Sequence, residues 1–219
     1  MALDSRFLGL NDNNAVTTFT SRTGNNSPTQ ATASLKATFK TAIQGGQPIV
    51  RFVGGVATQD YYDLSSFILA QPFFATITYK ATAATTSPHL FDATANSNRV
   101  TFATDPTGVT PGELFIYSGG ANSLTENFDS RGTWWITSGL YNGASSALYR
   151  AGNQVAAGTI GANSFATFRL GQTWSTSSPS ITAFNGDIAS LTIYKNGTNQ
   201  SIRKRLEHAA AYSFKLACS

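Results

Sequence analysis

Short apolar runs, repeatedly interrupted by turn-forming residues, constrain the fold of this chain more than any other feature. Clusters of Gly, Pro, Asn or Ser separate most of these runs. The runs occupy residues 73–80, 89–92, 99–104, 113–117, 133–139, 147–150, 154–157, 165–170 and 187–194. Many short strands with turn signals between them are typical of a two-sheet antiparallel sandwich and not of a parallel α/β sheet. The chain of 219 residues fits a single domain of this kind, because all-β domains reach about 200–250 residues without splitting.

The end of the chain carries a strand signal followed by a helix signal. Asn185-Gly186 supplies the positive backbone dihedrals of a tight turn, and the apolar residues after it predict a half-buried strand up to Tyr194. After Ser201, a candidate N-terminal cap, the apolar residues recur at the spacing of a helix. The pattern predicts a short helix at about 201–216 with its basic residues facing water.

The net positive charge of the chain is concentrated in that helix. Residues 201–219 carry a formal charge of +3, out of +4 for the whole chain. Nucleic-acid-binding proteins typically carry a basic surface interleaved with aromatic side chains, and the rest of this sequence has no such pattern. Residues 1–6 lack the apolar core of a signal peptide, and no stretch approaches the roughly 18 apolar residues of a membrane helix. We therefore expect neither nucleic acid nor membrane as a partner.

Several segments, taken in order, resemble LamG-like domains, which are concanavalin A-like jelly rolls found in phage and bacterial proteins. These segments are 21–26, 46–52, 134–143, 148–156 and 184–194. Within them, Gly152-Asn153 suits the two-residue turn of a hairpin. The resemblance covers roughly residues 15–216. It implies an all-β fold, a two-sheet antiparallel jelly-roll sandwich with a short C-terminal helix.

The N-terminal residues lie ahead of the resemblance and have a different character. Apart from Phe7, Leu8 and Leu10, residues 1–14 are mostly polar and Asn-rich, and they show neither helical nor alternating periodicity. We therefore expect an assembly arm at 1–14, which docks onto a partner subunit through these three apolar side chains. The jelly-roll domain then occupies 15–219.

The carboxylates of this chain do not indicate glycan cleavage. The resemblance implies that cleaving members carry paired carboxylates on one strand, because one carboxyl group protonates the leaving oxygen while the other attacks. Glu113, Glu126 and Glu207 each lack an acidic residue two or four positions away. Asp60 and Asp63 are three residues apart, so they point to different sides of a strand or turn. We expect no catalytic residues and no enzymatic activity.

Calcium is the metal that the resemblance implies, because related domains hold it with loop Asp and Asn oxygens and backbone carbonyls. The Phe-Asp-Gly sequence usual in the family is here Phe52-Val53-Gly54, which removes a carboxylate. Asp187 is interpreted as a turn residue that binds local amides. We therefore expect no metal and no cofactor.

Aromatic residues are the remaining candidates for a binding site, because sugar rings stack on exposed aromatic faces. Trp174 lies in the turn-rich segment 171–175, where such a ring would be accessible. Tyr61, Tyr62 and Tyr141 are weaker candidates for carbohydrate binding. For Trp174 the favoured alternative is packing beneath its own loop, since tryptophans are highly buried on average.

Three classes of function remain open. We favour a non-enzymatic structural protein of a phage particle, as a capsid decoration or as a fibre or tail accessory, because the domain begins with Met, fills the chain and has no linker or catalytic neighbour. A free carbohydrate-binding module is the alternative, and a glycan-cleaving enzyme is the third. The favoured interpretation predicts other virion proteins and further copies of the chain as partners, with host-surface glycan as an additional ligand. It places the protein in the virion, after synthesis in the host cytoplasm.

Overall fold

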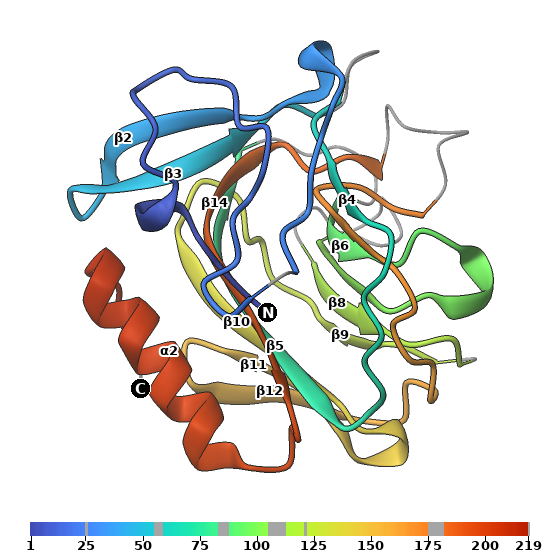
Figure 1. Cartoon of the computed structure of the whole chain (residues 1–219). Helices are drawn as coiled ribbons and strands as arrows, with labels where there is room; N and C mark the ends of the chain where they lie inside the picture. The colour runs from blue at the N-terminus through green and yellow to red at the C-terminus, as the bar shows by residue number, and fades with distance from the viewer. Residues whose placement is uncertain are drawn as a thin grey trace.

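The computed structural model in Figure 1 describes residues 1–24, 26–54, 59–82, 88–104, 113–120, 122–174 and 182–218. The strands are β1 (Ala2–Asp4), β2 (Thr38–Gln44), β3 (Gln47–Phe52), β4 (Tyr62–Leu64), β5 (Phe73–Ala81), β6 (His89–Asp92), β7 (Thr101–Thr104), β8 (Leu114–Tyr117), β9 (Leu124–Glu126), β10 (Trp135–Tyr141), β11 (Ser146–Arg150), β12 (Asn153–Gly158), β13 (Phe168–Leu170) and β14 (Gly186–Lys195). The helix α2 spans Gln200–Phe214, and single 3-10 turns are η1 (Ser5–Phe7), η2 (Ala33–Leu35), η3 (Asn96–Asn98) and η4 (Gly143–Ser145).

The strands form two antiparallel sheets that pack face to face. The larger sheet has the order β12-β11-β10-β5-β14-β3-β2, with β1 also paired to β14, and the smaller sheet has the order β4-β13-β6-β7-β8-β9. Helix α2 lies against the side of the larger sheet that faces away from the smaller one (Figure 1). The predicted fold class is confirmed: the protein is mostly β, with two antiparallel sheets and one short C-terminal helix.

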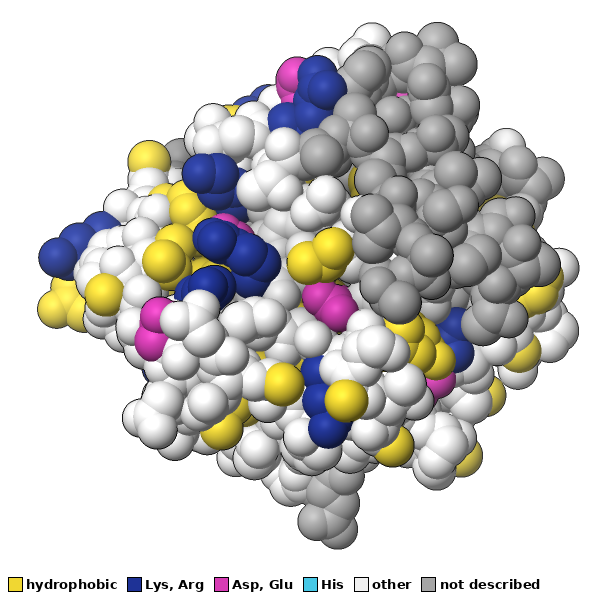
Figure 2. Space-filling view, turned by 90° about the horizontal axis from the view of Figure 1, so that it is seen from above, with side chains coloured by type: hydrophobic (Ala, Val, Ile, Leu, Met, Phe, Trp, Pro, Cys, Tyr) yellow, Lys and Arg dark blue, Asp and Glu magenta, His cyan; other side chains and the backbone are white. Residues whose placement is uncertain are grey.

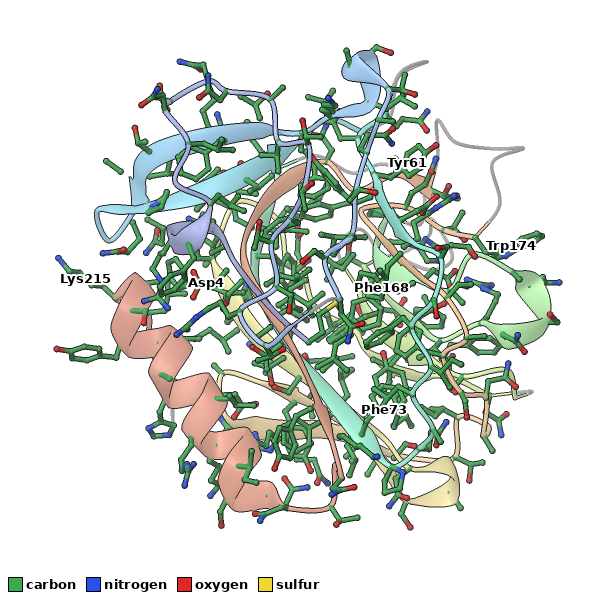
Figure 3. All side chains as sticks on the ribbon, in the orientation of Figure 1. Asp4, Tyr61, Phe73, Phe168, Trp174 and Lys215 are labelled. Carbon is green, nitrogen blue, oxygen red and sulfur yellow. The ribbon has the colours of Figure 1, made fainter. Side chains whose placement is uncertain are left out.

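Alternation along β5 sends its side chains into two different buried layers. Phe73, Ile77 and Tyr79 belong to the main core between the sheets, where Figure 3 shows Phe73 and Phe168. The intervening Phe74 points to the other side and stacks on Tyr194 with ring centroids 5.5 Å apart. Every residue of β5 except Lys80 is buried, because the smaller sheet covers one face of the larger sheet and α2 covers the other.

Helix α2 differs from its prediction at both ends and in its buried face. It is capped by Asn199, whose side chain accepts hydrogen bonds from the backbone N–H groups of Ser201 (3.1 Å) and Ile202 (3.3 Å), and not by Ser201. The helix ends at Phe214 because Lys215 adopts a left-handed conformation with φ of 52°. Arg203 does not face water: it is 2% exposed.

The predicted turn between β11 and β12 is displaced by one residue. Arg150 pairs with Asn153 across the hairpin, so the two turn residues are Ala151 and Gly152, with φ values of 48° and 90°. Glycine adopts such positive φ values at little cost. The prediction of Gly152-Asn153 as the turn was therefore wrong by one position.

Asn185-Gly186 does not form the predicted tight turn. Gly186 is already the first residue of β14 and pairs with Phe52 on one side and Ala81 on the other. A Cβ atom at this position would lie 2.2 Å from the carbonyl oxygen of Lys80. Glycine is required here by the close approach of two backbones, and not by a hairpin.

The N-terminal residues are built into the larger sheet, which corrects the expectation of an arm that stands apart from the sandwich. Residues Ala2–Asp4 form β1 and pair with β14, and Leu3 is 1% exposed within the main core. Leu8 and Leu10 are partly buried against the same core, whereas Phe7 is 52% exposed. The boundary drawn after residue 14 does not separate two structural units. Docking of Phe7 onto a partner remains a prediction.

No helix among the residues that the structure describes combines the length and the apolar character needed to cross a membrane.

Candidate functional site

Two of the four predicted carbohydrate-binding aromatics are inside the protein. Tyr62 and Tyr141 are fully buried. The Tyr62 hydroxyl donates to the carbonyl oxygen of Val16 at 2.8 Å, and the Tyr141 hydroxyl donates to that of Thr101 at 2.8 Å. Burial raises the pKa of both phenols above the usual value. Neither ring can stack on a sugar, so both assignments were wrong.

The other two predicted aromatics are partly exposed and belong to the same side of the molecule. Trp174 follows β13 and Tyr61 precedes β4, which is the neighbour of β13 in the smaller sheet. Figure 3 shows both side chains on the side of the protein away from α2, with Trp174 pointing outward. They flank the outer face of the smaller sheet, the face that does not pack against the larger sheet.

Asp92 organises this outer face from a fully buried position on β6. Its two carboxylate oxygens accept hydrogen bonds from Ala93 N (2.8 Å), Thr101 Oγ1 (2.6 Å), Arg99 Nε (3.1 Å), Thr173 Oγ1 (3.1 Å) and Trp174 N (3.4 Å). A carboxylate offers about four lone-pair sites, so Asp92 has no capacity left for a ligand. Its role is to hold Arg99 and the backbone of Trp174 in place.

His89 completes the environment of Arg99. The Arg99 Nη2 lies 3.0 Å from His89 Nε2 and 2.9 Å from the Asp92 carboxylate. A guanidinium group can only donate hydrogen bonds, so this nitrogen of His89 is the acceptor and carries no proton. His89 is 4% exposed. This histidine therefore positions an arginine and is not available to a ligand.

A second arginine, Arg169, links β13 to β4 on the same face of the smaller sheet. Arg169 on β13 pairs with Asp63 on β4 through Nε–Oδ1 and Nη2–Oδ2 distances of 2.6 and 2.7 Å. Its guanidinium carbon lies 4.5 Å from the centre of the Tyr61 ring, and its Nη1 donates to the carbonyl oxygen of Thr173 at 3.3 Å. Two carboxylates and two guanidinium groups thus balance one another on this face.

Two aromatics that the sequence analysis did not single out complete the outer face. In β8 the side chains of Leu114 and Ile116 are buried, whereas Phe115 and Tyr117 point outward and are partly exposed. Their rings are nearly parallel, with an interplanar angle of 11° and centroids 6.3 Å apart. The Arg99 guanidinium lies 5.4 Å from the Tyr117 ring. The uninterrupted hydrophobic run 114–117 was the signal that could have identified them, because successive side chains of a strand point to opposite faces and two of these four must therefore point outward.

We call this set of residues the outer face: Tyr61, Asp63, Asp92, Arg99, Phe115, Tyr117, Arg169 and Trp174. It combines a charge-balanced polar centre with aromatic rings at its borders. Flat polar surfaces bordered by aromatic rings suit ligands that carry both hydroxyl groups and apolar C–H faces.

Asp187 is not the turn residue that the sequence suggested. It lies opposite Arg51 in the pairing of β14 with β3, and the two side chains form a bidentate ion pair with distances of 2.7 and 3.0 Å. Among the residues that the structure describes, no group of three or more His, Cys, Asp or Glu side chains could hold a metal ion.

No family model matches this chain, and no curated protein matches it by sequence. Domain 4 of AbnA, a GH43 extracellular arabinanase from Geobacillus stearothermophilus, in complex with arabinotriose, is similar with a TM-score of 0.57 at 17% identity, over 79% of this chain and 80% of that one. The CBM40 of a Ruminococcus gnavus IT-sialidase bound to α2,3-sialyllactose has a TM-score of 0.52 at 14% identity, over 77% and 98%.

A third similar structure is a native heptameric SAP-like pentraxin from Limulus polyphemus, with a TM-score of 0.51 at 12% identity over 68% of this chain and 76% of that one. At this level of identity the likenesses show the fold alone. They support a jelly-roll sandwich of the kind found in pentraxins and carbohydrate-binding modules.

Proposed function

We propose that this chain is a carbohydrate-binding domain without catalytic activity, and that the outer face of its smaller sheet contacts the sugar. The observation that carries the proposal is the position of Trp174. Its ring is partly exposed, and its backbone is anchored to the buried Asp92, which also orients Arg99. A partly exposed aromatic ring and an oriented guanidinium group, both held through the same buried carboxylate, would provide a stacking surface and hydrogen-bond donors.

The chemistry of the outer face fits a neutral or weakly charged glycan. Sugar rings present apolar C–H faces to aromatic rings and hydroxyl groups to polar side chains. The Asp92 carboxylate is saturated by its own neighbours, so the polar contacts would come from Arg99, whose side chain is 21% exposed, and from Asp63, whose side chain is 37% exposed. Both side chains are already held by ion pairs, which reduces the entropy lost on binding.

Similar solved structures support the same class of ligand. The arabinanase domain and the sialidase module are described in complex with arabinotriose and with sialyllactose, respectively. This support places the carbohydrate-binding module, which the sequence analysis held as the alternative, ahead of the virion structural protein. Decoration of a capsid, a place in a fibre or tail, and self-assembly stay predictions from the sequence. A glycan-binding face would serve such a protein by contacting the host surface.

The carboxylates of the outer face support a non-catalytic role. A glycoside hydrolase needs one carboxyl group that can donate a proton and a second that attacks or activates water. Asp63 and Asp92 each accept hydrogen bonds from an arginine, so both carboxylates are engaged in contacts that hold the outer face together. We expect no release of reducing ends from β-glucans, alginate or bacterial surface polysaccharides. Release that disappears in Asp63→Asn would contradict this part of the proposal.

The central test compares Trp174→Ala with the wild-type protein on a glycan array that carries neutral and acidic oligosaccharides. The wild type should bind at least one glycan class, and Trp174→Ala should lose at least tenfold in affinity while the free energy of unfolding changes by no more than about 1 kcal/mol. Tyr212→Ala is the matched control, because Tyr212 is a 90% exposed aromatic on α2. It should bind as the wild type does.

Three outcomes would contradict the proposal. The wild type could bind no glycan, Trp174→Ala could bind as well as the wild type, or the two aromatic variants could lose binding equally. A large loss of stability in Trp174→Ala would show instead that the ring is packed against the protein. In that event the assignment of Trp174 as a sugar contact is wrong.

A further inference from the structure

A cavity of about 120 Å³ lies on the opposite side of the larger sheet, between the N-terminal segment and α2. Its lining includes the charged residues Asp4, Arg6 and Arg22, together with Ser190, Thr192, Leu206 and Phe214. Figure 3 labels Asp4 at this junction, close to the end of α2 that carries Lys215. The cavity shares no residue with the outer face, so it is independent of the proposed glycan site.

The charges around this cavity do not cancel. Arg6 forms a bidentate ion pair with Asp4, with Nε–Oδ1 and Nη2–Oδ2 distances of 2.9 and 2.6 Å. Arg22 forms no ion pair with any residue that the structure describes. Its guanidinium carbon lies 4.0 Å from the centre of the Phe7 ring. One positive charge is therefore held at the cavity without a neutralising carboxylate.

The ring of Phe7 keeps the two arginines beside the cavity. The Arg6 guanidinium carbon lies 5.6 Å from the Phe7 centroid and 5.3 Å from that of Phe214. Arginines that stack on aromatic rings lose little entropy when they bind an anion. Figure 2, which views the molecule from above, shows Lys and Arg side chains gathered beside hydrophobic ones in the left half of the face.

The rest of the lining adds hydroxyl groups and an apolar wall. Ser190 and Thr192 lie on β14 and contribute two hydroxyl groups, and the Ser190 hydroxyl donates to Thr78 Oγ1 at 3.1 Å. Leu206 and Phe214 contribute aliphatic and aromatic surface from α2. A ligand that fits this lining has one anionic end and a short apolar end.

We propose that this cavity binds a small monocarboxylate, with its carboxylate between Arg22 and Arg6 and its alkyl part against Leu206 and Phe214. A single unpaired guanidinium group matches one negative charge, and guanidinium groups bind carboxylates through two parallel hydrogen bonds. A volume of about 120 Å³ is several times the roughly 10–15 Å³ that one water molecule needs. It accommodates a short-chain acid or the carboxylate end of a peptide.

The test uses sodium butyrate as the probe and amide NMR spectra of the full chain as the readout. Butyrate should produce saturable shifts of the amide signals of Ser190, Thr192 and Leu206. Butyramide, which has the same size and no charge, should produce none. Arg22→Gln should weaken butyrate binding at least tenfold. Arg205→Gln, which removes an exposed arginine of α2 outside the cavity, should bind as the wild type does.

A comparison of two peptides identifies the source of the carboxylate. A short peptide with a free C-terminal carboxylate, compared with its amidated form, distinguishes a protein partner from a free acid. Binding of the free-acid peptide but not of its amidated form supports the proposal, whether or not butyrate binds. Absence of saturable shifts with both butyrate and the free-acid peptide overturns it, as does equal binding of butyramide or unchanged binding by Arg22→Gln. Arg22→Gln should leave glycan binding unchanged, so this test and the glycan test fail separately.

Discussion

Burial of one carboxyl group, Asp60, makes the stability of this protein depend on pH. Asp60 is 5% exposed, and its Oδ2 accepts a hydrogen bond from the Val53 N–H at 2.7 Å. Desolvation outweighs this hydrogen bond and raises the pKa of Asp60 from 3.8 to about 6. The folded protein therefore holds this proton more tightly than the unfolded chain does. The contribution to stability is fully present below pH 3.8 and is lost as the pH rises through about 6.

Asp60→Asn should remove this dependence, because an asparagine keeps an oxygen acceptor for the Val53 N–H and carries no charge. The pKa difference corresponds to about 3 kcal/mol, so Asp60→Asn should be more stable than the wild type at pH 7.5 by up to that amount. The measurement is urea unfolding between pH 4.5 and 7.5. Asp129→Asn is the control, since the Arg131 side chain lowers the pKa of Asp129 to about 2. Equal pH slopes in the wild type and Asp60→Asn would disprove the assignment.

Single residues of the site could be predicted only in part from the sequence. Tyr61 and Tyr62 are adjacent on an extended segment, so one of them must point inward, but their shared chemistry does not say which. Tyr62 is the inner one because its hydroxyl bonds to Val16 and Ala37. The role of Asp92 could not be foreseen at all, since its partners come from positions as distant as Trp174.

At the scale of elements, the buried strands could be predicted, whereas of the strands at the sheet edges only β12 could. The nine residues of β5 are apolar enough to show a strong signal. In β2 only Phe39 is buried, because this strand lies at the edge of its sheet, and it therefore lacks the alternation that marks a half-buried strand. Strands of three residues, such as β1, β4 and β9, are too short to carry a periodic pattern.

Helix α2 shows why an apolar period alone did not identify its buried face. The buried positions are Arg203, Glu207, Ala211 and Phe214. The Arg203 guanidinium lies 3.8 Å from the centre of the Tyr149 ring, and Arg203 forms an ion pair with Glu207. Below the helix the sheet surface carries hydroxyl groups such as Thr76 and Ser138, which bond to each other at 2.8 Å. A polar layer on the sheet accepts a charged pair that a purely apolar surface would exclude.

The cap of α2 gives a prediction at this scale. Asn199→Ala should lower the free energy of unfolding by about 1 kcal/mol, because it removes the acceptor for two N–H groups of the first turn. Ser201→Ala is the matched control: Ser201 is exposed and accepts no cap hydrogen bond with its side chain. It should change stability by no more than about 0.5 kcal/mol. Urea unfolding measures both, and a larger loss in Ser201→Ala would reinstate the sequence-based cap.

At the scale of the whole molecule, both ends of the chain pack against the same region of the larger sheet. β14 pairs with β3 at Gly186–Ile188 and then with β1 at Ser190–Thr192, so the N-terminal strand continues the row begun by β3. Helix α2 then covers this region with Phe214 packed on Ile49 and Ala189. Neither the N-terminal strand nor α2 lies on the outer face of the smaller sheet.

The N-terminal residues, which the sequence analysis assigned to a docking arm alone, include one buried and one exposed apolar side chain. Leu3 is 1% exposed in the core, so Leu3→Ala should lower the free energy of unfolding by about 2–5 kcal/mol through lost burial and a cavity. Phe7 is 52% exposed, so Phe7→Ala should cost no more than about 1 kcal/mol, mainly through lost stacking with Arg22 and Arg6.

Urea unfolding of both variants, together with sedimentation of the folded proteins, distinguishes a structural strand from a docking arm. If Phe7 docks onto a partner copy, Phe7→Ala should reduce the oligomer while its stability per chain changes little, and Leu3→Ala should show the reverse pattern. If wild type and Phe7→Ala sediment alike as monomers, the predicted assembly role of Phe7 is lost. Comparable stability losses in the two variants would contradict the burial difference itself, because an exposed ring cannot contribute as much as a fully buried leucine.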